Sequence, residues 1–328
     1  MRGDCNDCAG HCLRPVPLCV QNLDEARGAD CHVVDALASV AIVADRLRMR
    51  QALIDIGEVT RGRVRLPESH SIGSLEELTD VCRVLACRGE RGGGREFWLV
   101  KPRVACGVNE SHEMCLVLSP SALPQAVRPF RDSAGMHVLS CKCAADRECC
   151  STGTFLLLQA SSLSVMVEAF HNHGGEQLKC YVAGADVFVQ HKHSFPDVLG
   201  PSDNGTACHI GEAARACQQP FLFRFHSLSS MPQAPGPLVP QLAYDEDLVR
   251  ECAAEIAART GLALFGFDLI QPSGQQHWLL IDCNAFPSFK GVADAPSALR
   301  RYLRAIAARG KGQASAADWG TAAAPVPA

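Results

Sequence analysis

Hydrophobic positions along the chain recur at two spacings, which predict helices and strands in turn. Helical spacing marks four segments: 33–56 (stopped by Gly57), 75–85, 245–259 (capped by Asp245 and ended by Gly261) and 297–309. Short apolar runs predict strands at 97–100, 163–170 and 221–225, and hairpins at 177–190 (turn 184–186) and 262–283 (turn 272–274). Helices and hairpins without a regular βαβ repeat favour an α+β protein with antiparallel sheets.

The last hairpin ends in a group of oxygen-bearing side chains. The apolar run 278–281 stops at Asp282, and Asn284 follows two residues later, on the same face of the strand. A turn centred near residue 274 or 275 places Asp268 opposite residue 281 or 282. Two carboxylates this close repel unless a cation lies between them, and oxygen ligands suit Mg²⁺. The pattern favours a magnesium site of Asp268, Asp282 and Asn284 over a solvated strand end without metal.

Two lysines are placed to meet the phosphates that such a metal needs as further ligands. Lys101 ends the strand 97–100, and Lys179 lies within the strand 177–183. A lysine in a buried strand is costly unless it is paired. We therefore expect an anionic ligand near Lys179, with a salt bridge to Glu176 or another carboxylate as the alternative.

Composition narrows the class of protein. The chain has 328 residues, is 47% hydrophobic and carries a net charge of −4. These values predict a globular protein without the basic field of a nucleic-acid-binding protein. Neither a membrane span nor the apolar core of a signal peptide is evident, so we expect a cytoplasmic protein without a membrane partner. The segment 87–96 is interpreted as a linker, because a strand follows its glycines instead of a helix.

The 18 cysteines are expected to be free thiols, because no secretory signal is evident. Two clusters are dense enough to raise the alternative of a zinc site: Cys5, Cys8, His11 and Cys12, and Cys141, Cys143, Cys149 and Cys150. Neither cluster has two separate CxxC pairs. We interpret both as parts of loops.

Three segments together resemble one enzyme family: KPRVACGVNESHEM (101–114), VEAFHNHGGEQLKCYVAG (167–184) and LFGFDLI…IDCNAFPSFKGV (264–292). The sequence is similar to inositol-tetrakisphosphate 1-kinase, also called inositol 1,3,4-trisphosphate 5/6-kinase. The resemblance runs from about residue 33 to 308, with insertions. It implies an ATP-grasp fold, in which two subdomains with antiparallel sheets enclose ATP. The Asp…Asp-x-Asn pattern alone indicates ATP-grasp enzymes in general.

The resemblance also implies roles for individual residues. Asp268, Asp282 and Asn284 would hold Mg²⁺, as two ions, against the phosphates of ATP. The nucleotide would be bound by Arg46, Lys101, Gly107, Glu168, Ala169, Phe170 and Lys179. The inositol phosphate would be bound by His112, Lys179, Asn284 and Ser288. Lys179 and His112 would be the catalytic residues. Further basic side chains available for a polyanion are Arg103, Lys192, Lys290, His171, His173, His191 and His193.

The sequence departs from the family at its start and at single positions. About 32 unrelated residues stand where the family has an α/β domain that carries inositol-phosphate-binding lysines. Glu168 replaces a glutamine, Cys106 a histidine, Ser288 a glycine and Lys290 an acidic residue. The expected organisation is an irregular segment 1–32, a central subdomain 33–168 with an insertion at about 132–162, a C-terminal subdomain 169–309 with the metal site, and a disordered tail 310–328.

The function that this implies is an Mg²⁺-dependent kinase. It would transfer the γ-phosphate of ATP to inositol 1,3,4-trisphosphate at the 5 or 6 position, or to inositol 3,4,5,6-tetrakisphosphate at the 1 position. We expect a monomer acting on this small molecule. Two alternatives stay open: a non-catalytic nucleotide or inositol phosphate binding remnant, and an ATP-grasp ligase that joins a carboxylate to an amine.

Overall fold

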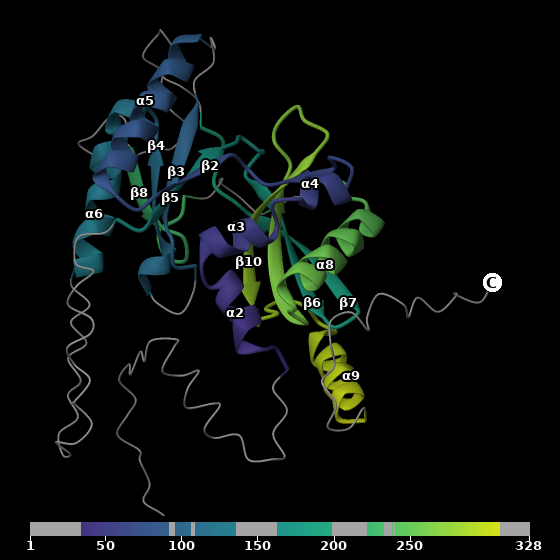
Figure 1. The fold of residues 1–328 in the computed structure, drawn as a ribbon. Helices are drawn as coiled ribbons and strands as arrows, with labels where there is room; N and C mark the ends of the chain where they lie inside the picture. The colour runs from purple at the N-terminus through teal and green to yellow at the C-terminus, as the bar shows by residue number, and fades with distance from the viewer. Residues whose placement is uncertain are drawn as a thin grey trace, which may run out of the picture.

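Two five-stranded sheets form the centre of the protein (Figure 1). The computed structural model describes residues 34–91, 96–105, 109–135, 163–198, 222–232, 238 and 240–308. The expectations for residues 1–32, both cysteine clusters, Cys106, Gly107 and the tail from 310 lie outside these ranges.

The first sheet has the strand order β1-β10-β9-β6-β7. Its strands are β1 (Val64–Arg65), β6 (Glu176–Ala183), β7 (Asp186–His193), β9 (Leu264–Ile270) and β10 (Trp278–Ala285). All neighbours are antiparallel except β1 and β10, which run parallel. Both expected hairpins are therefore present, and β1 adds a parallel pair that the sequence pattern did not predict.

The second sheet has the order β2-β5-β3-β4-β8 and is antiparallel throughout. Its strands are β2 (Ser69–Ile72), β3 (Phe97–Pro102), β4 (Glu113–Val117), β5 (Val165–Phe170) and β8 (Leu222–His226). The expected strands at 97–100, 163–170 and 221–225 correspond to β3, β5 and β8. The strands β2 and β4 were not expected.

The segment 33–56 is not one helix, as its periodicity had suggested. It forms α2 (Leu37–Val43), α3 (Arg46–Ala52) and α4 (Ile56–Val59). The break lies at Asp45, which is extended and accepts hydrogen bonds from the backbone N–H of Leu47 and Arg48. Asp45 also forms a bridge with Val104 and an ion pair with Arg103. These contacts with a segment far along the chain outweigh the local helical pattern.

The other helices follow the expected positions more closely. Helix α8 (Glu246–Thr260) is capped by Asp245 and ends at Gly261, whose φ is +74°. Helix α9 (Ala295–Ala308) matches the last expected helix. Helix α5 (Leu75–Arg91) is longer than expected, so the linker interpretation of 87–96 is wrong for 87–91. Helix α6 (Leu123–Gly135), which follows the 3₁₀ turns Asn109–His112 and Pro120–Ala122, includes the first residues of the expected insertion.

Each sheet has its own hydrophobic core. Residues of α2, α3, α4 and α8 pack on the first sheet with Leu178, Phe267 and Leu280, whereas α5 and α6 lie against the second sheet (Figure 1). Each sheet contains strands from before and after residue 168, where the boundary between the two subdomains was expected. In the first sheet β1 pairs with β10, and in the second β4 pairs with β8. Within the described ranges, no helix has the length and apolar character needed to cross a bilayer.

Candidate functional site

The predicted metal ligands lie on neighbouring strands in the middle of the first sheet. Lys179 of β6 stands opposite Asp268 of β9, which stands opposite Asp282 of β10. A β-bulge between Leu280 and Asp282 leaves Ile281 as an extra residue and settles the register that the sequence left open. Without the bulge, Leu280 and Asp282 would share a face. With it, Leu280 lies in the core beneath α8, and Asp282 takes the same face as Asp268.

The charged groups of this row are in direct contact. The Lys179 Nζ atom lies 3.1 Å from Oδ1 of Asp268 and donates a hydrogen bond to Oδ2 at 3.2 Å. Lys179 therefore pairs with a carboxylate, as the alternative interpretation of the sequence allowed, and its partner is Asp268 instead of Glu176. Its pKa is raised: burial lowers it, but the charges of Asp268 and Asp282 outweigh burial. The Asn284 Nδ2 atom donates to Oδ2 of Asp282 at 2.7 Å.

Two carboxylate oxygens in this group are suited to a cation. Oδ1 of Asp282 is buried and accepts no hydrogen bond from the described residues. Oδ1 of Asp268 is also buried, and the Lys179 ammonium lies 3.1 Å from it. Burial raises the pKa of Asp268 from 3.8 to about 6, with Lys179 opposing the rise and Asp282 adding to it. A divalent ion would satisfy Oδ1 of Asp282, share the Asp268 carboxylate with Lys179 and take the place of a proton.

The donor set fits Mg²⁺ in its chemistry. Two carboxylates are joined by Asn284, whose amide oxygen is left available when its Nδ2 binds Asp282. Mg²⁺ is usually held by one or two carboxylates and completed by water and phosphate oxygens. Within the described ranges, no three His, Cys, Asp or Glu side chains come together as a metal site. The protein by itself thus offers two carboxylates and an amide, and phosphates would have to supply further ligands.

Lys101 connects the two sheets. It lies on β3, is only 5% exposed and forms an ion pair with Glu168 of β5. Its Nζ atom also lies 3.5 Å from the carbonyl oxygen of Ile281, the bulged residue of β10. The ammonium group therefore lies in the space between the sheets, where the sequence had placed a phosphate contact.

Arg46 is occupied by backbone carbonyls. Its guanidinium donates to the oxygens of Pro102 at 2.6 Å, Val104 at 2.7 Å and Ser111 at 3.2 Å. These bonds tie α3 to the end of β3 and to the 3₁₀ turn Asn109–His112. The nucleotide contact expected for Arg46 stays a prediction.

His112 lies between the second sheet and the metal group. Its Nδ1 atom is 3.1 Å from the hydroxyl of Ser227, and its ring lies 5.4 Å from that of His226. Burial lowers the pKa of His112, His226 and Arg46 lower it further, and Asp282 raises it. The charge of Asp282 is therefore felt at His112, so the imidazole is near the carboxylates and neutral at physiological pH.

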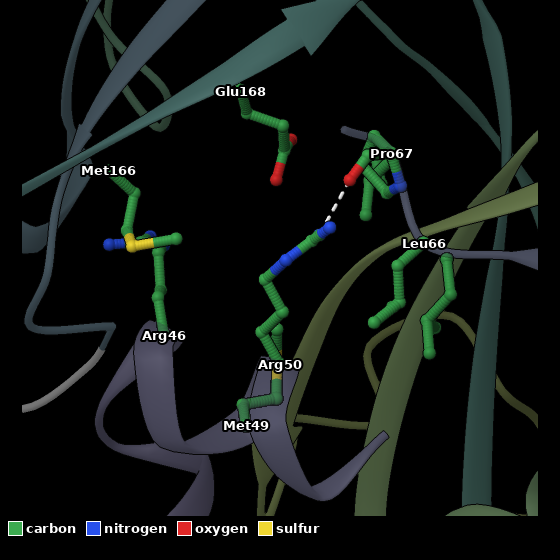
Figure 2. A pocket seen from close by; sticks show the side chains of 9 residues that line it. Arg46, Met49, Arg50, Leu66, Pro67, Met166 and Glu168 are labelled. Atoms are coloured by element: carbon green, nitrogen blue, oxygen red, sulfur yellow. Dashed lines mark hydrogen bonds between the residues drawn. The ribbon is translucent and has the colours of Figure 1, made fainter. Parts of the chain in front are cut away.

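A narrow pocket lies between the sheets, next to the Lys101 contacts Glu168 and Ile281. It is lined by residues of α3, of the β1–β2 connection, of β5 and of β10: Arg46, Met49, Arg50, Leu66, Pro67, Met166, Glu168, Leu280 and Ile281. Figure 2 shows the guanidinium of Arg50 between Glu168 and Pro67. A wider cleft of about 370 Å³ adjoins it at Leu66 and Pro67 and includes Ala169 and Phe170 of the expected hinge. Arg50 was missed by the sequence reasoning, although its place one helical turn after Arg46 was a usable signal.

Of the other side chains expected to contact ligands, some are accessible to solvent and others are already bonded to groups of the protein. Ser288 and Lys290 are exposed, and Lys192 is half-buried. Arg103 is paired with Asp45. The remaining assignments are structural: His173 bonds the His171 carbonyl and the Ser194 hydroxyl, and His191 pairs with the buried Glu176. The backbone N–H of Ala169 donates to the Glu68 carbonyl at 2.8 Å.

Part of the chain matches a model of a known protein family. Residues 154–305 match the family model described as the inositol 1,3,4-trisphosphate 5/6-kinase ATP-grasp domain. Just under half of the chain is therefore similar to this kinase domain. The α+β fold is accordingly an ATP-grasp fold, with the candidate site at the facing sides of its two sheets.

Curated relatives of this family extend the similarity to most of the chain. Inositol-tetrakisphosphate 1-kinase 6 of Oryza sativa (indica and japonica) is 26% identical over 277 residues, which cover 81% of this chain and 41% of the relative. Inositol-tetrakisphosphate 1-kinase 3 of Arabidopsis thaliana is 23% identical over 297 residues, covering 87% and 67%. The chain thus spans about two-fifths of the length of the rice relatives. Among solved structures, D-cycloserine synthetase DcsG has a TM-score of 0.48 and 16% identity, covering 88% of this chain and 76% of its own.

Proposed function

We propose that the protein is an ATP-dependent inositol phosphate kinase. The observation that carries the proposal is the row Lys179, Asp268 and Asp282, in which the buried Oδ1 of Asp282 has no hydrogen-bond partner among the described residues, in a chain whose residues 154–305 match the kinase family model. Phosphoryl transfer depends on positioning and charge neutralisation more than on a reactive side chain. A lysine beside a pair of carboxylates able to hold a divalent ion provides both.

The nucleotide would lie between the sheets, with its base toward Glu168, Ala169 and Phe170. Lys101 and Lys179 approach this space from opposite sheets and would neutralise phosphate oxygens. Asp268, Asp282 and Asn284 would hold Mg²⁺, which supplies positive charge to the β- and γ-phosphates. Arg46 would act through the backbone carbonyls that it binds, by fixing the end of β3 beside Lys101.

The acceptor would enter where His112, Asn284 and Ser288 border the metal group. A neutral His112 donates a hydrogen bond to a phosphate or hydroxyl oxygen. Lys179, together with the exposed Lys290, would balance the charge of a polyanion. The acceptors that we propose are those that the family resemblance implies: inositol 1,3,4-trisphosphate at its 5 or 6 hydroxyl and inositol 3,4,5,6-tetrakisphosphate at its 1 hydroxyl.

Transfer of radiolabel from [γ-³²P]ATP to either inositol phosphate in the presence of Mg²⁺ tests this function. A variant with Asp268→Ala and Asp282→Ala should lose transfer and also lose the Mg²⁺-dependent part of ADP binding measured by calorimetry. Asp186→Ala is the matched control, because Asp186 lies at the β6–β7 turn of the same sheet and pairs with Arg301.

Each result separates the candidate functions. ADP binding without transfer to an inositol phosphate would favour the non-catalytic binding remnant over the kinase. Label transfer only with a carboxylate and an amine would favour a ligase. Magnesium–ADP binding that is equally tight in the double variant would contradict the metal site itself.

A further inference from the structure

Glu168 places a negative charge where the proposed nucleotide phosphates and base would meet. The carboxylate forms an ion pair with Lys101, and its side chain is 15% exposed. The guanidinium of Arg50 also lies near it (Figure 2). Burial lowers the pKa of Arg50, and the charge of Glu168 opposes this. Glu168 therefore has an ion-pair partner in Lys101 and a second cation nearby in Arg50.

The pocket that Glu168 and Arg50 border is narrow. Its free volume is about 10 Å³, which is room for roughly one water molecule. Lys101 is 5% exposed and its ammonium group is already in contact with Glu168 and near the Ile281 carbonyl. A ligand with phosphate groups therefore reaches Lys101 only if these side chains rearrange.

We propose that Glu168 is an internal anion that occupies Lys101 until a nucleotide phosphate displaces it, and that Arg50 receives the displaced carboxylate. The inference rests on the proposed nucleotide site and adds a competition to it. Glu168 and a phosphate cannot both pair fully with the Lys101 ammonium, because the two anions would then lie side by side and repel each other.

Arg50 is suited to the receiving role. Its Nη1 atom donates to the carbonyl oxygen of Pro67 at 2.5 Å, which holds the guanidinium at the pocket wall facing Glu168. A rotation of the Glu168 side chain toward Arg50 would keep the carboxylate paired while releasing Lys101. An arginine fork can bind a carboxylate and a carbonyl at the same time.

Calorimetric titration with ADP and with adenosine tests the competition. Glu168→Gln keeps the size of the side chain and removes its charge, so ADP should bind about tenfold more tightly, a gain of about 1.4 kcal/mol. Adenosine has no phosphate for Lys101 and should bind the variant and the wild type within about twofold. The unliganded variant should melt at a lower temperature, because Lys101 loses its counter-charge.

Arg50→Met tests the receiving role in the opposite direction. With no second partner for Glu168, ADP should bind roughly tenfold more weakly than to the wild type, again with little effect on adenosine. Asp80→Asn is the control, because Asp80 is an exposed carboxylate that pairs with Arg83 on α5 and lines neither the pocket nor the cleft. It should leave ADP affinity unchanged.

The outcomes are distinct. If the wild type binds ADP and Glu168→Gln binds it equally well or more weakly, the competition is refuted while the nucleotide site stands. A gain that is as large for adenosine as for ADP would also refute it, because the effect would then not involve the phosphates. If neither protein binds ADP, both the competition and the proposed function fail.

Discussion

His173 shows what single buried residues contribute to this protein. Its Nδ1 atom lies 2.7 Å from the His171 carbonyl and its Nε2 atom 2.8 Å from the Ser194 hydroxyl. This geometry suits a neutral ring that donates at Nδ1 and accepts at Nε2. Burial lowers the pKa of His173; the His171 carbonyl and the charge of Asp197 oppose this, and the charge of His171 adds to it. The residue thus fixes the turn that leads from β5 to β6.

His173 and the other histidines with lowered pKa values should therefore reduce the stability of the protein in acid, whereas Asp268, whose pKa is raised to about 6, acts in the opposite direction with a single group. The unfolded chain takes up a proton at His173 near the ordinary pKa of 6.5, whereas the folded protein resists it to lower pH. The free energy of unfolding should decrease as pH falls below that value, as measured by urea denaturation at about pH 8 and about pH 5. Burial lowers the pKa of His70, His112, His171 and His277 in the same direction.

His173→Gln should reduce this loss, because one of the groups that resist protonation is removed. The readout is the difference in unfolding free energy between the two pH values, so any uniform destabilisation by the substitution cancels. An unchanged difference would show that His173 takes no part in the acid effect.

The sequence anticipated residues whose contacts are local and missed those whose contacts are distant. The two-residue period of a strand places Asp282 and Asn284 on one face, and the hairpin brings Asp268 opposite residue 281 or 282. The bulge at Ile281, which no sequence pattern showed, then decides that Asp282 is the partner of Asp268. Arg46 was assigned to the nucleotide, but its partners Pro102, Val104 and Ser111 lie 56 to 65 residues away. No periodic pattern carries information about such partners.

At the scale of elements, turns and helix ends decide how the layers pack. The turn between β6 and β7 contains Gly184, whose φ is +62°. A Cβ atom at this position would lie 2.5 Å from the ring of Tyr302 on α9. The ring is 5% exposed and belongs to the cluster that joins α9 to the first sheet with Tyr181 and Phe289. The absence of a side chain at Gly184 is therefore what lets α9 approach.

Gly184→Ala should destabilise the protein more than Gly274→Ala. Both glycines have positive φ and would pay about 1 kcal/mol for a side chain, but nothing lies within 4 Å of a Cβ atom at Gly274. Crowding against Tyr302 should add about 1 to 3 kcal/mol. Urea denaturation of the two variants measures the difference; equal losses would mean that α9 shifts freely.

Elements with strong local signals were confirmed, and those set by other parts of the chain were not. Helix α8 has a cap, a periodic face and a terminal glycine within one short segment, and it was found with nearly correct ends. The helix expected at 33–56 breaks at Asp45 because of Arg103, 58 residues away. The two-residue strand β1 has no recognisable pattern of its own and exists because β10 lies beside it.

At the scale of the whole molecule, the site depends on both sheets. The metal group belongs to the first sheet, and Glu168 and the hinge belong to the second. Lys101 spans the distance between them. A ligand that contacts both sheets should raise the unfolding free energy of both, whereas a ligand that contacts one sheet should raise the unfolding free energy of that sheet alone.

Two tryptophans can report on the sheets separately. Trp278 is 5% exposed in the core of the first sheet, and Trp98 is 1% exposed in the core of the second. Variants with Trp319→Phe and either Trp98→Phe or Trp278→Phe leave one of them as the fluorescent probe. Magnesium–ADP at about a hundredfold excess over its Kd should raise the unfolding free energy by about 2.7 kcal/mol at both probes. A rise seen only by Trp278 would show that the first sheet alone holds the nucleotide.

The bulged residue Ile281 of β10 bears on how firmly the register of the site is fixed. The strand has eight residues against seven in β9, and the surplus could in principle settle at any of several points along it. If it moved toward the C-terminal end, the Asp282 carboxylate would turn under α8 among thiols and aliphatic groups, at a cost of several kcal/mol. This cost keeps the extra residue at Ile281. The carboxylate that would bind the cation therefore also fixes the register of β10 against β9.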